Sequence, residues 1–215
     1  MELEKIMNER HSTRVFLDKP VSREMIEKLL FLATRAPSAI NLQPWEFTVV
    51  MGEERQRLSK ALVKSMRERN ISCGPDAVRP LPEHFMDRQR DLANCILPHL
   101  DKGVQLQDFT NEGSCNFYGA PVAIIVTIDR AFSKSRLVDA GIAIGYMVLA
   151  AHNMGLGTCP IGLINAFGDE IREALNISEE KDVVVGVAVG YPDPNAQINL
   201  ASSTRAPIDE VARFY

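Results

Sequence analysis

The stretch DAGIAIGYMVLAAHNMGLGTCPIGL, residues 139–163, organises this chain. Its first half is apolar on every side over residues 140–151, which predicts a helix of about four turns enclosed by protein rather than lying on a surface. Asp139 is a suitable N-cap, and Gly155 and Gly157 supply a left-handed stop at the other end. The helix is too short to cross a bilayer, which needs about 20 apolar residues. We therefore expect a buried central helix.

Small residues near the start of this helix indicate a face where another backbone approaches closely, and a second copy of the same helix would fit there. These residues are Ala140, Gly141, Ala143 and Gly145. The run at 158–162 has little side-chain bulk. From the run alone, a plain helix-to-strand turn is the preferred interpretation, and a backbone surface for a flat ligand is the alternative.

Composition sets limits on the class of protein. The chain has 215 residues, of which 46% are hydrophobic and 24% charged, a profile typical of one globular domain spanning 1–215. A net charge of −4 argues against nucleic-acid or membrane-surface binding. The N-terminus lacks a signal peptide and no run can span a membrane, so we expect a cytoplasmic protein. The spacing of the cysteines predicts free thiols and no metal site; they are Cys73, Cys95, Cys115 and Cys159.

Residues 10–14, RHSTR, combine two guanidinium groups, an imidazole and two hydroxyls. Guanidinium forks match phosphate geometry, and hydroxyls and backbone amides add donors, so the segment is a candidate phosphate cradle. A solvated basic turn is the alternative. A second candidate segment is the loop at 37–45, which two prolines stiffen. Ser38, Asn41 and Gln43 would bond either the polar edge of a heterocycle or one another.

Periodicity predicts an α+β layered protein, because helical segments separate strands that are covered on both faces. The expected helices lie at 2–10, 22–35, 53–69, 83–97 and 168–175, in addition to the central one. The expected strands lie at 46–51, 121–128 and 181–190. The segment at 102–116 is polar and is predicted to be irregular, mobile and a wall of a substrate pocket.

Six motifs in order resemble the nitroreductase family of FMN-dependent enzymes. They are RHSTR at 10–14, APSAINLQPW at 36–45, FYGAP at 117–121, DAGIAIGYMVLAAHNMGLGTCPIG at 139–162, VGYPD at 189–193 and TRAPIDE at 204–210. The resemblance implies a nitroreductase-like sandwich, with a central mixed or antiparallel sheet packed by helices, in an intertwined homodimer with FMN at the interface. It also implies a variable pocket-lining region at about 53–116 and a C-terminal arm at about 194–215.

The resemblance further implies the cofactor contacts. Arg10, His11, Ser12 and Arg14 resemble the first flavin-binding segment, and Arg205 resembles a C-terminal arginine that binds the phosphate. Pro37, Ser38, Ala39 and Asn41 resemble the loop that the other subunit lays along the flavin. Pro160, Ile161 and Gly162 resemble the turn behind the isoalloxazine, with the Gly162 N–H near N5.

This chain departs from the pattern of that family at three positions near the expected cofactor. Asn116 stands where some relatives carry a lysine that reaches the pyrimidine edge of the flavin, and a neutral amide stabilises reduced flavin less than a cation does. Gly162 stands where several relatives have glutamate. Ser203 stands where some have a second basic phosphate ligand. The expected consequences are a different reduction potential and fewer cations around the cofactor.

The implied reaction is a ping-pong transfer of hydride from NADH or NADPH through FMN to a nitroaromatic, a quinone or a similar electron-poor small molecule, with no catalytic side chain. The sequence does not choose between NADH and NADPH, because it has no dinucleotide fingerprint. A flavin-dependent dehalogenase, a flavin-modifying relative and a non-catalytic flavin-binding protein are the alternatives.

Overall fold

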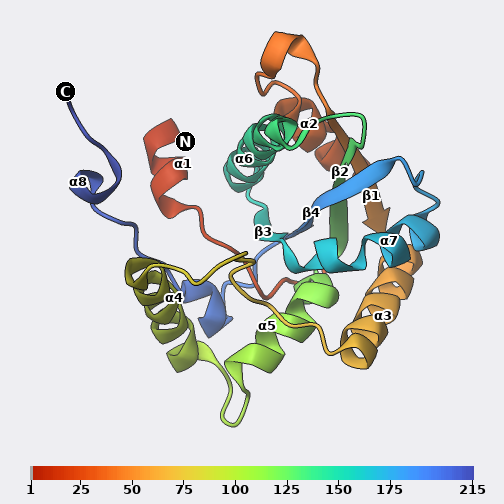
Figure 1. The fold of residues 1–215 in the computed structure, drawn as a ribbon. Coiled ribbons are helices and arrows are strands. Elements are labelled where there is room, and N and C mark those ends of the chain that lie inside the picture. Colours follow the sequence, from red (N-terminus) through yellow and green to blue (C-terminus); the bar gives the residue numbers. More distant parts are fainter. Residues whose placement is uncertain (1) are drawn as a thin grey trace.

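The computed structural model describes residues 2–215 (Figure 1). Its helices are α1 (Leu3–Glu9), α2 (Arg23–Ala33), α3 (Gly52–Arg69), α4 (Glu83–Ile96), α5 (Leu106–Cys115), α6 (Leu137–Asn153), α7 (Gly168–Leu175) and α8 (Ile208–Val211). Its strands are β1 (Trp45–Met51), β2 (Val122–Asp129), β3 (Gly157–Ile161) and β4 (Lys181–Gly190). Short 3-10 helices lie at Ala39–Asn41, Leu97–His99, Phe117–Gly119, Lys134–Arg136, Leu163–Phe167 and Gln197–Leu200.

The four strands form one sheet in the order β1-β2-β4-β3, and every neighbouring pair is antiparallel. β2 and β4 are central, which explains why both are almost continuously apolar. A register shift between Val126 and Thr127 interrupts the β2–β4 pairing. The prediction of an α+β fold with a central mixed or antiparallel sheet is confirmed, and the sheet is of the antiparallel kind.

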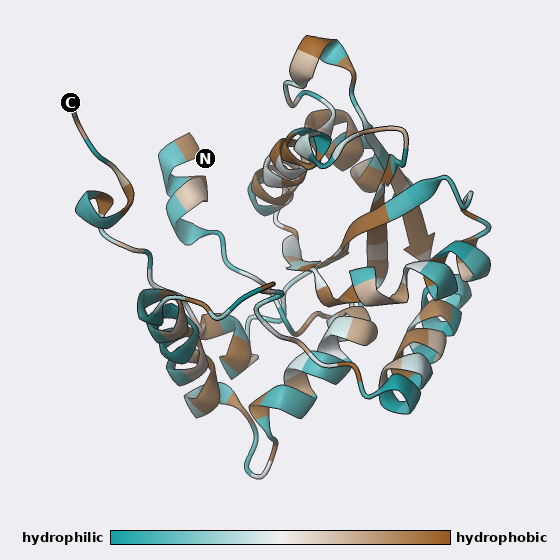
Figure 2. Ribbon diagram, in the orientation of Figure 1, coloured by the Kyte–Doolittle hydropathy of each residue, from teal (hydrophilic) through white to brown (hydrophobic). Residues whose placement is uncertain are grey.

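Side chains alternate between two cores along the central strands. On β2, Ile124 and Val126 face a core built with α2 and α6, whereas Ala123 and Ile125 face a core built with α3 and the segment around Phe167. Helices therefore cover both faces of the sheet (Figure 1). Figure 2 shows the hydrophobic colouring concentrated on the strands and α6, while α4 is largely hydrophilic. Among residues 2–215, no helix combines the length and the apolar character that crossing a bilayer requires.

The central helix α6 differs from its prediction in two respects. It begins at Leu137, so Asp139 is its third residue and not its N-cap. One of its faces is also open in the single chain, where the side chains of Val138 and Tyr146 are 64% and 44% exposed. The other face packs on the sheet and on α2, as predicted, and the enclosure of the open face by a second copy stays a prediction.

The segment at 102–116 was predicted to be irregular, and this is wrong. Residues 106–115 form α5, whose last turn is buried although its side chains are small or polar. Asn111 explains part of this, because its Oδ1 accepts hydrogen bonds from the backbone N–H of Cys73 at 2.7 Å and from the side chain of Gln107 at 3.1 Å. A polar sequence read for apolar periodicity does not reveal such a network.

The other boundaries follow the sequence closely. Strand β4 and helix α7 span the predicted residues. Helix α2 begins after Ser22, whose Oγ accepts the N–H of Met25 at 3.3 Å, as predicted for an N-cap. On α1 only Ile6 is buried, whereas Leu3 and Met7 are exposed.

Candidate functional site

A cleft of 170 Å³ lies where the two ends of the chain meet. The first wall comes from α1 and the segment after it, and the second comes from α4 and the segment before α8. Its lining includes Arg10, His11, Ser12, Arg14, Cys95, Ser203 and Arg205. The structure therefore brings together every residue that the sequence analysis assigned to the phosphate, although 190 or more positions separate Arg205 from the others.

Electrostatics within this cleft favour an anion. Burial first, and the charge of Arg205 second, lower the pKa of Arg10, so the positive charges of both side chains act in this cleft. The Arg14 guanidinium donates to the carbonyl of Ser12 at 3.4 Å, yet its Nε is buried and has no hydrogen-bond partner within residues 2–215. A dianion with several acceptor oxygens would satisfy both features.

Asn199 fastens the two ends together, and sequence reasoning missed it. Its Oδ1 accepts the backbone N–H groups of Arg14 at 2.9 Å and Val15 at 3.2 Å, and its Nδ2 donates to the Val15 carbonyl at 2.8 Å. Asn199 is 8% exposed. No local motif marks it, because its role depends on contacts across 184 residues of chain.

Residues 157–161 form the edge strand β3 and Gly162 follows it, so most of this run is a strand and not the predicted turn. One edge of β3 pairs with β4. The segment after α1 covers part of the other edge, where the Thr13 N–H bonds to the Thr158 carbonyl at 2.9 Å. Backbone N–H and C=O groups alternate in direction along a strand, so the backbone of Pro160 points away from β4, as that of Thr158 does. The Ile161 carbonyl points toward β4, and the N–H of Gly162, on the opposite side of the same peptide, therefore points outward. Pro160 and Gly162 are exposed. Since proline has no N–H to leave unpaired, it suits this edge.

Ser12 connects the cleft to β3, because it lines the cleft and also pairs with a residue of that strand. Ser12 bridges to Thr158, two residues before Pro160. A ligand that extends from the cleft along this bridge would reach the outward backbone groups of β3. This arrangement suits a flat ring held by main-chain atoms.

The loop at 37–43 lies apart from this cleft. It is anchored at the N-terminal end of α6, where the Ala39 N–H bonds to Oδ1 of Asp139 at 3.4 Å. β3 begins beyond the other end of α6, which spans about 25 Å at 1.5 Å per residue. Polar groups of the loop bond one another, as in the Gln43 N–H to Ser38 Oγ bond of 3.0 Å. One chain therefore holds the two predicted halves of the site at opposite ends of a helix.

Asn116 occupies the C-cap of α5, and the cleft lining does not include it. Its backbone carbonyl accepts from Arg55 at 3.1 Å, and its side-chain Oδ1 is buried without a partner within residues 2–215. Its contact with a flavin stays a prediction.

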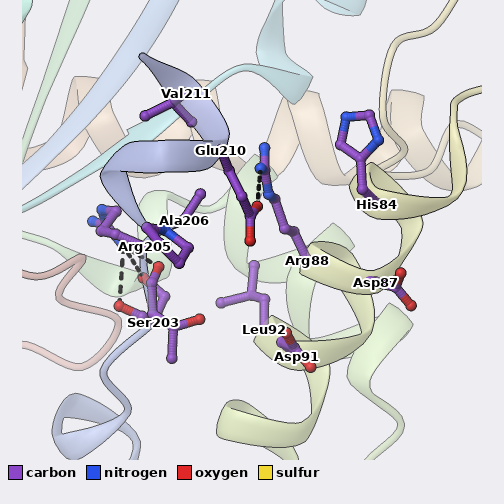
Figure 3. Close-up of a pocket in the computed structure, with 12 residues that line it drawn as sticks. His84, Asp87, Arg88, Asp91, Leu92, Ser203, Arg205, Ala206, Glu210 and Val211 are labelled. Carbon is purple, nitrogen blue, oxygen red and sulfur yellow. Dashed lines mark hydrogen bonds and ion pairs between the residues drawn. The ribbon is translucent and has the colours of Figure 1, made fainter. Parts of the chain in front are cut away.

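A larger pocket of 610 Å³ adjoins the cleft and shares Leu92, Ser203 and Arg205 with it. Figure 3 shows this pocket between α4 and the C-terminal segment, with the Arg88 to Glu210 ion pair of 3.1 Å across it. The Arg205 guanidinium is turned back onto Ser203, donating to Oγ at 2.8 Å. The arm that carries Arg205 is thus tied to α4.

Residues 2–215 hold no group of three or more His, Cys, Asp or Glu side chains arranged to bind a metal. Cys159 is 4% exposed, and burial raises the pKa of its thiol, which agrees with a packing role. The described chain leaves all four cysteines free.

The Nitroreductase family model matches residues 7–191, and the chain belongs to this family. It is 32% identical to the 4-nitrobenzoate reductase of Pseudomonas putida over 218 residues, covering 99% of this chain and 94% of the relative. It is 30% identical to the chloronitrobenzene nitroreductase of Comamonas testosteroni over 223 residues, covering 99% and 96%. The solved FMN-dependent nitroreductase NfnB of Mycobacterium smegmatis, in complex with NADPH, superposes with a TM-score of 0.87 at 28% identity over 99% of this chain and 97% of that one.

Proposed function

We propose that this protein is an FMN-dependent oxidoreductase that passes electrons from NAD(P)H to nitroaromatic compounds. The observation that carries the proposal is the arginine-lined cleft at the meeting point of the chain ends, which the bridge from Ser12 to Thr158 connects to β3. The names of the relatives, which reduce 4-nitrobenzoate and chloronitrobenzene, support the nitroaromatic class.

Arg10, Arg14 and Arg205 would hold the phosphate of FMN, with Ser12 and His11 beside them. The fit rests on the buried Nε of Arg14, which has no hydrogen-bond partner within residues 2–215, and on a cleft lining that holds three arginines and no carboxylate. Pro160, Ile161 and Gly162 would lie against the flavin ring and offer the outward Gly162 N–H. These assignments follow from position and charge, and they extend the predictions made from the sequence.

FMN, when bound, would supply the redox chemistry that links NADH or NADPH to the acceptor. The protein contributes grip, orientation and exclusion of water. Within residues 2–215 the cleft lining contains no carboxylate. A strong negative charge beside the phosphate is therefore avoided, and we assign no side-chain acid, base or nucleophile.

The proposal includes a homodimer. Because the loop at 37–43 and the β3 edge lie at opposite ends of α6, an antiparallel pair of α6 helices would bring the loop of one copy to the β3 edge of the other. The open face of α6 carries Val138, Gly141 and Gly145, spaced three and four residues apart as one helical stripe. A Cβ added at either glycine meets nothing within 4 Å, so this stripe leaves room for a close partner backbone.

We also propose a cytoplasmic location, because four unpaired cysteines suit a reducing compartment. Residues 1–215 would act as one domain, with 53–116 as the wall of the acceptor pocket and 194–215 as an arm.

The test is anaerobic reduction of the FMN-loaded protein by NADH and by NADPH, followed by addition of 4-nitrobenzoate, nitrobenzene or a quinone. We expect loss of the oxidised-flavin absorbance with at least one nucleotide and its return with a nitroaromatic. Failure of both nucleotides to reduce bound FMN would eliminate the oxidoreductase, and reoxidation by none of the acceptors would eliminate the substrate class.

A further inference from the structure

Asp139 occupies an unusual place for a carboxylate. It lies in the first turn of α6, is 5% exposed and caps no helical N–H. Its Oδ2 accepts from Nη1 of Arg136 at 3.1 Å, and its Oδ1 accepts from the N–H of Ala39 at 3.4 Å. A buried charge is costly unless it is paired, so this arrangement links α6 firmly to a loop 100 residues earlier in the chain.

That loop is strained. Ile40, Asn41 and Gln43 have φ values of 44°, 60° and 48°, in the left-handed region. For the β-branched Ile40 this conformation is unfavourable, and such strain persists only where the surroundings impose it. Packing does not impose it within one chain, because Ile40 is 90% exposed. The restraints on the loop are hydrogen bonds.

Those hydrogen bonds have a clear hierarchy. The Asn41 N–H to Ser38 carbonyl bond of 3.1 Å and the Leu42 N–H to Ala39 carbonyl bond of 3.0 Å close turns inside the loop. They define its shape but do not fix it on the protein. The Ala39 to Asp139 bond ties the strained turn to a helix, and the Arg136 guanidinium holds the carboxylate in the orientation to make it.

We propose that Asp139 is a positioning residue, which with Arg136 fixes the strained turn at 38–43 in the conformation that meets the flavin of a second copy. The inference rests on the proposed function for the identity of what the turn meets, and on the contacts above for the anchoring itself. Asp139 acts through the backbone of Ala39 and touches no reacting atom. Its negative charge at the N-terminal turn of α6 is also favourable there.

The decisive experiment is hydrogen exchange followed by mass spectrometry on the apoprotein, comparing wild type with Asp139→Ala, Asp139→Asn and Arg136→Gln. Without the acceptor, peptides covering 38–43 should lose protection by roughly tenfold, the scale of one hydrogen bond to a charged group. Asp139→Asn keeps an acceptor oxygen and should retain part of the protection. Asp182→Asn is the matched control: Asp182 lies on β4 and forms an exposed ion pair with Arg130, so its replacement should leave the exchange of the loop unchanged.

Holoprotein spectra provide the second readout. Because the turn meets the flavin ring and the phosphate cleft lies at the far end of α6, Asp139→Ala should weaken FMN binding by no more than about tenfold, while the visible absorption of the bound flavin shifts. Asp139→Asn should restore the spectrum in part. Should Asp139→Ala be too unstable to purify, Asp139→Asn and Arg136→Gln give the same comparison.

Two results would overturn the proposal: unchanged exchange at 38–43 in all three variants, or lost protection confined to the first turn of α6, which would indicate a purely helical role. If the wild-type protein bound no FMN, the proposed function would be refuted instead. The hydrogen exchange of the apoprotein would still show whether Asp139 anchors the turn.

Discussion

Gly157→Ala tests the junction between the phosphate cleft and β3. A Cβ at position 157 would lie 2.8 Å from Cβ and 2.9 Å from Cγ2 of Thr13, distances that real contacts do not reach. Thr13 is 2% exposed and donates its N–H to the Thr158 carbonyl at 2.9 Å. The added methyl group therefore has to push the segment at 12–14 away from the sheet.

The magnitude has two parts. Overpacking of this kind costs about 1–3 kcal/mol of unfolding free energy. For a chain of this size that lowers Tm by roughly 2–12 °C. Displacing Ser12 and Arg14 also removes at least one charge-assisted bond to the phosphate, so FMN affinity should fall about 10- to 100-fold. Thermal unfolding of the apoprotein and FMN titration measure the two effects separately.

Ile171→Ala is the matched control. Ile171 lies on α7, is fully buried in the core on the α3 face of the sheet and is not one of the proposed cofactor positions, and its truncation costs about 2–5 kcal/mol. It should lower Tm by a similar amount and leave FMN affinity within about threefold. If Gly157→Ala lowered Tm but not FMN affinity, or if both variants weakened FMN equally, the junction would not hold the cofactor.

Three further predictions follow from the site and from α6. Arg205→Gln should weaken FMN binding about 10- to 100-fold in a titration, because the cleft loses one cation. It should not change Tm, since the side chain is exposed and bonds only within 203–205. An unchanged FMN affinity would show that Arg205 is not part of the site. Burial, and then the charge of His11, lower the pKa of His152, so folding favours the neutral imidazole and stability is lost as pH falls from the ordinary value of 6.5 through the folded value. Denaturant titrations should show a flatter acid limb for His152→Gln, and parallel limbs would contradict this. Val138→Glu should convert the dimer to monomer in analytical ultracentrifugation and weaken FMN binding, because a charge would be buried in the α6 stripe; a dimer of full strength would move the interface elsewhere.

Regular elements were predictable because their signals are local. Buried strands can be predicted from the β-branched runs at 121–128 and 181–190 without knowledge of their neighbours. The start of α2 can be predicted from Ser22, whose side chain caps the helix. Helix α5 was not predicted because polar contacts, and not apolar ones, hold it in place. Asn111 and Gln107 bond to the backbone of Cys73, which lies more than 30 residues earlier in the chain.

The candidate site divides in the same way. RHSTR at 10–14 has the composition of an anion cradle, but composition alone cannot say that Arg205 comes to it or that Asn199 fastens the two. β3 was missed as a strand because Pro160 and flanking glycines suggest a turn, whereas the edge position tolerates proline. Asp139 precedes the apolar run directly, which is the position typical of an N-cap. Its true partner, Ala39, follows only from the packing of α2 and the loop against α6.

The most direct test of the central claim, that the arginines at the two chain ends grip the phosphate of a flavin, is a calorimetric titration of the wild-type apoprotein with FMN and with riboflavin, which lacks that phosphate. The account predicts one FMN per chain and binding of riboflavin weaker by about 100-fold or more, the worth of several charge-assisted bonds. Equal affinity for the two flavins, or no binding of FMN, would contradict it.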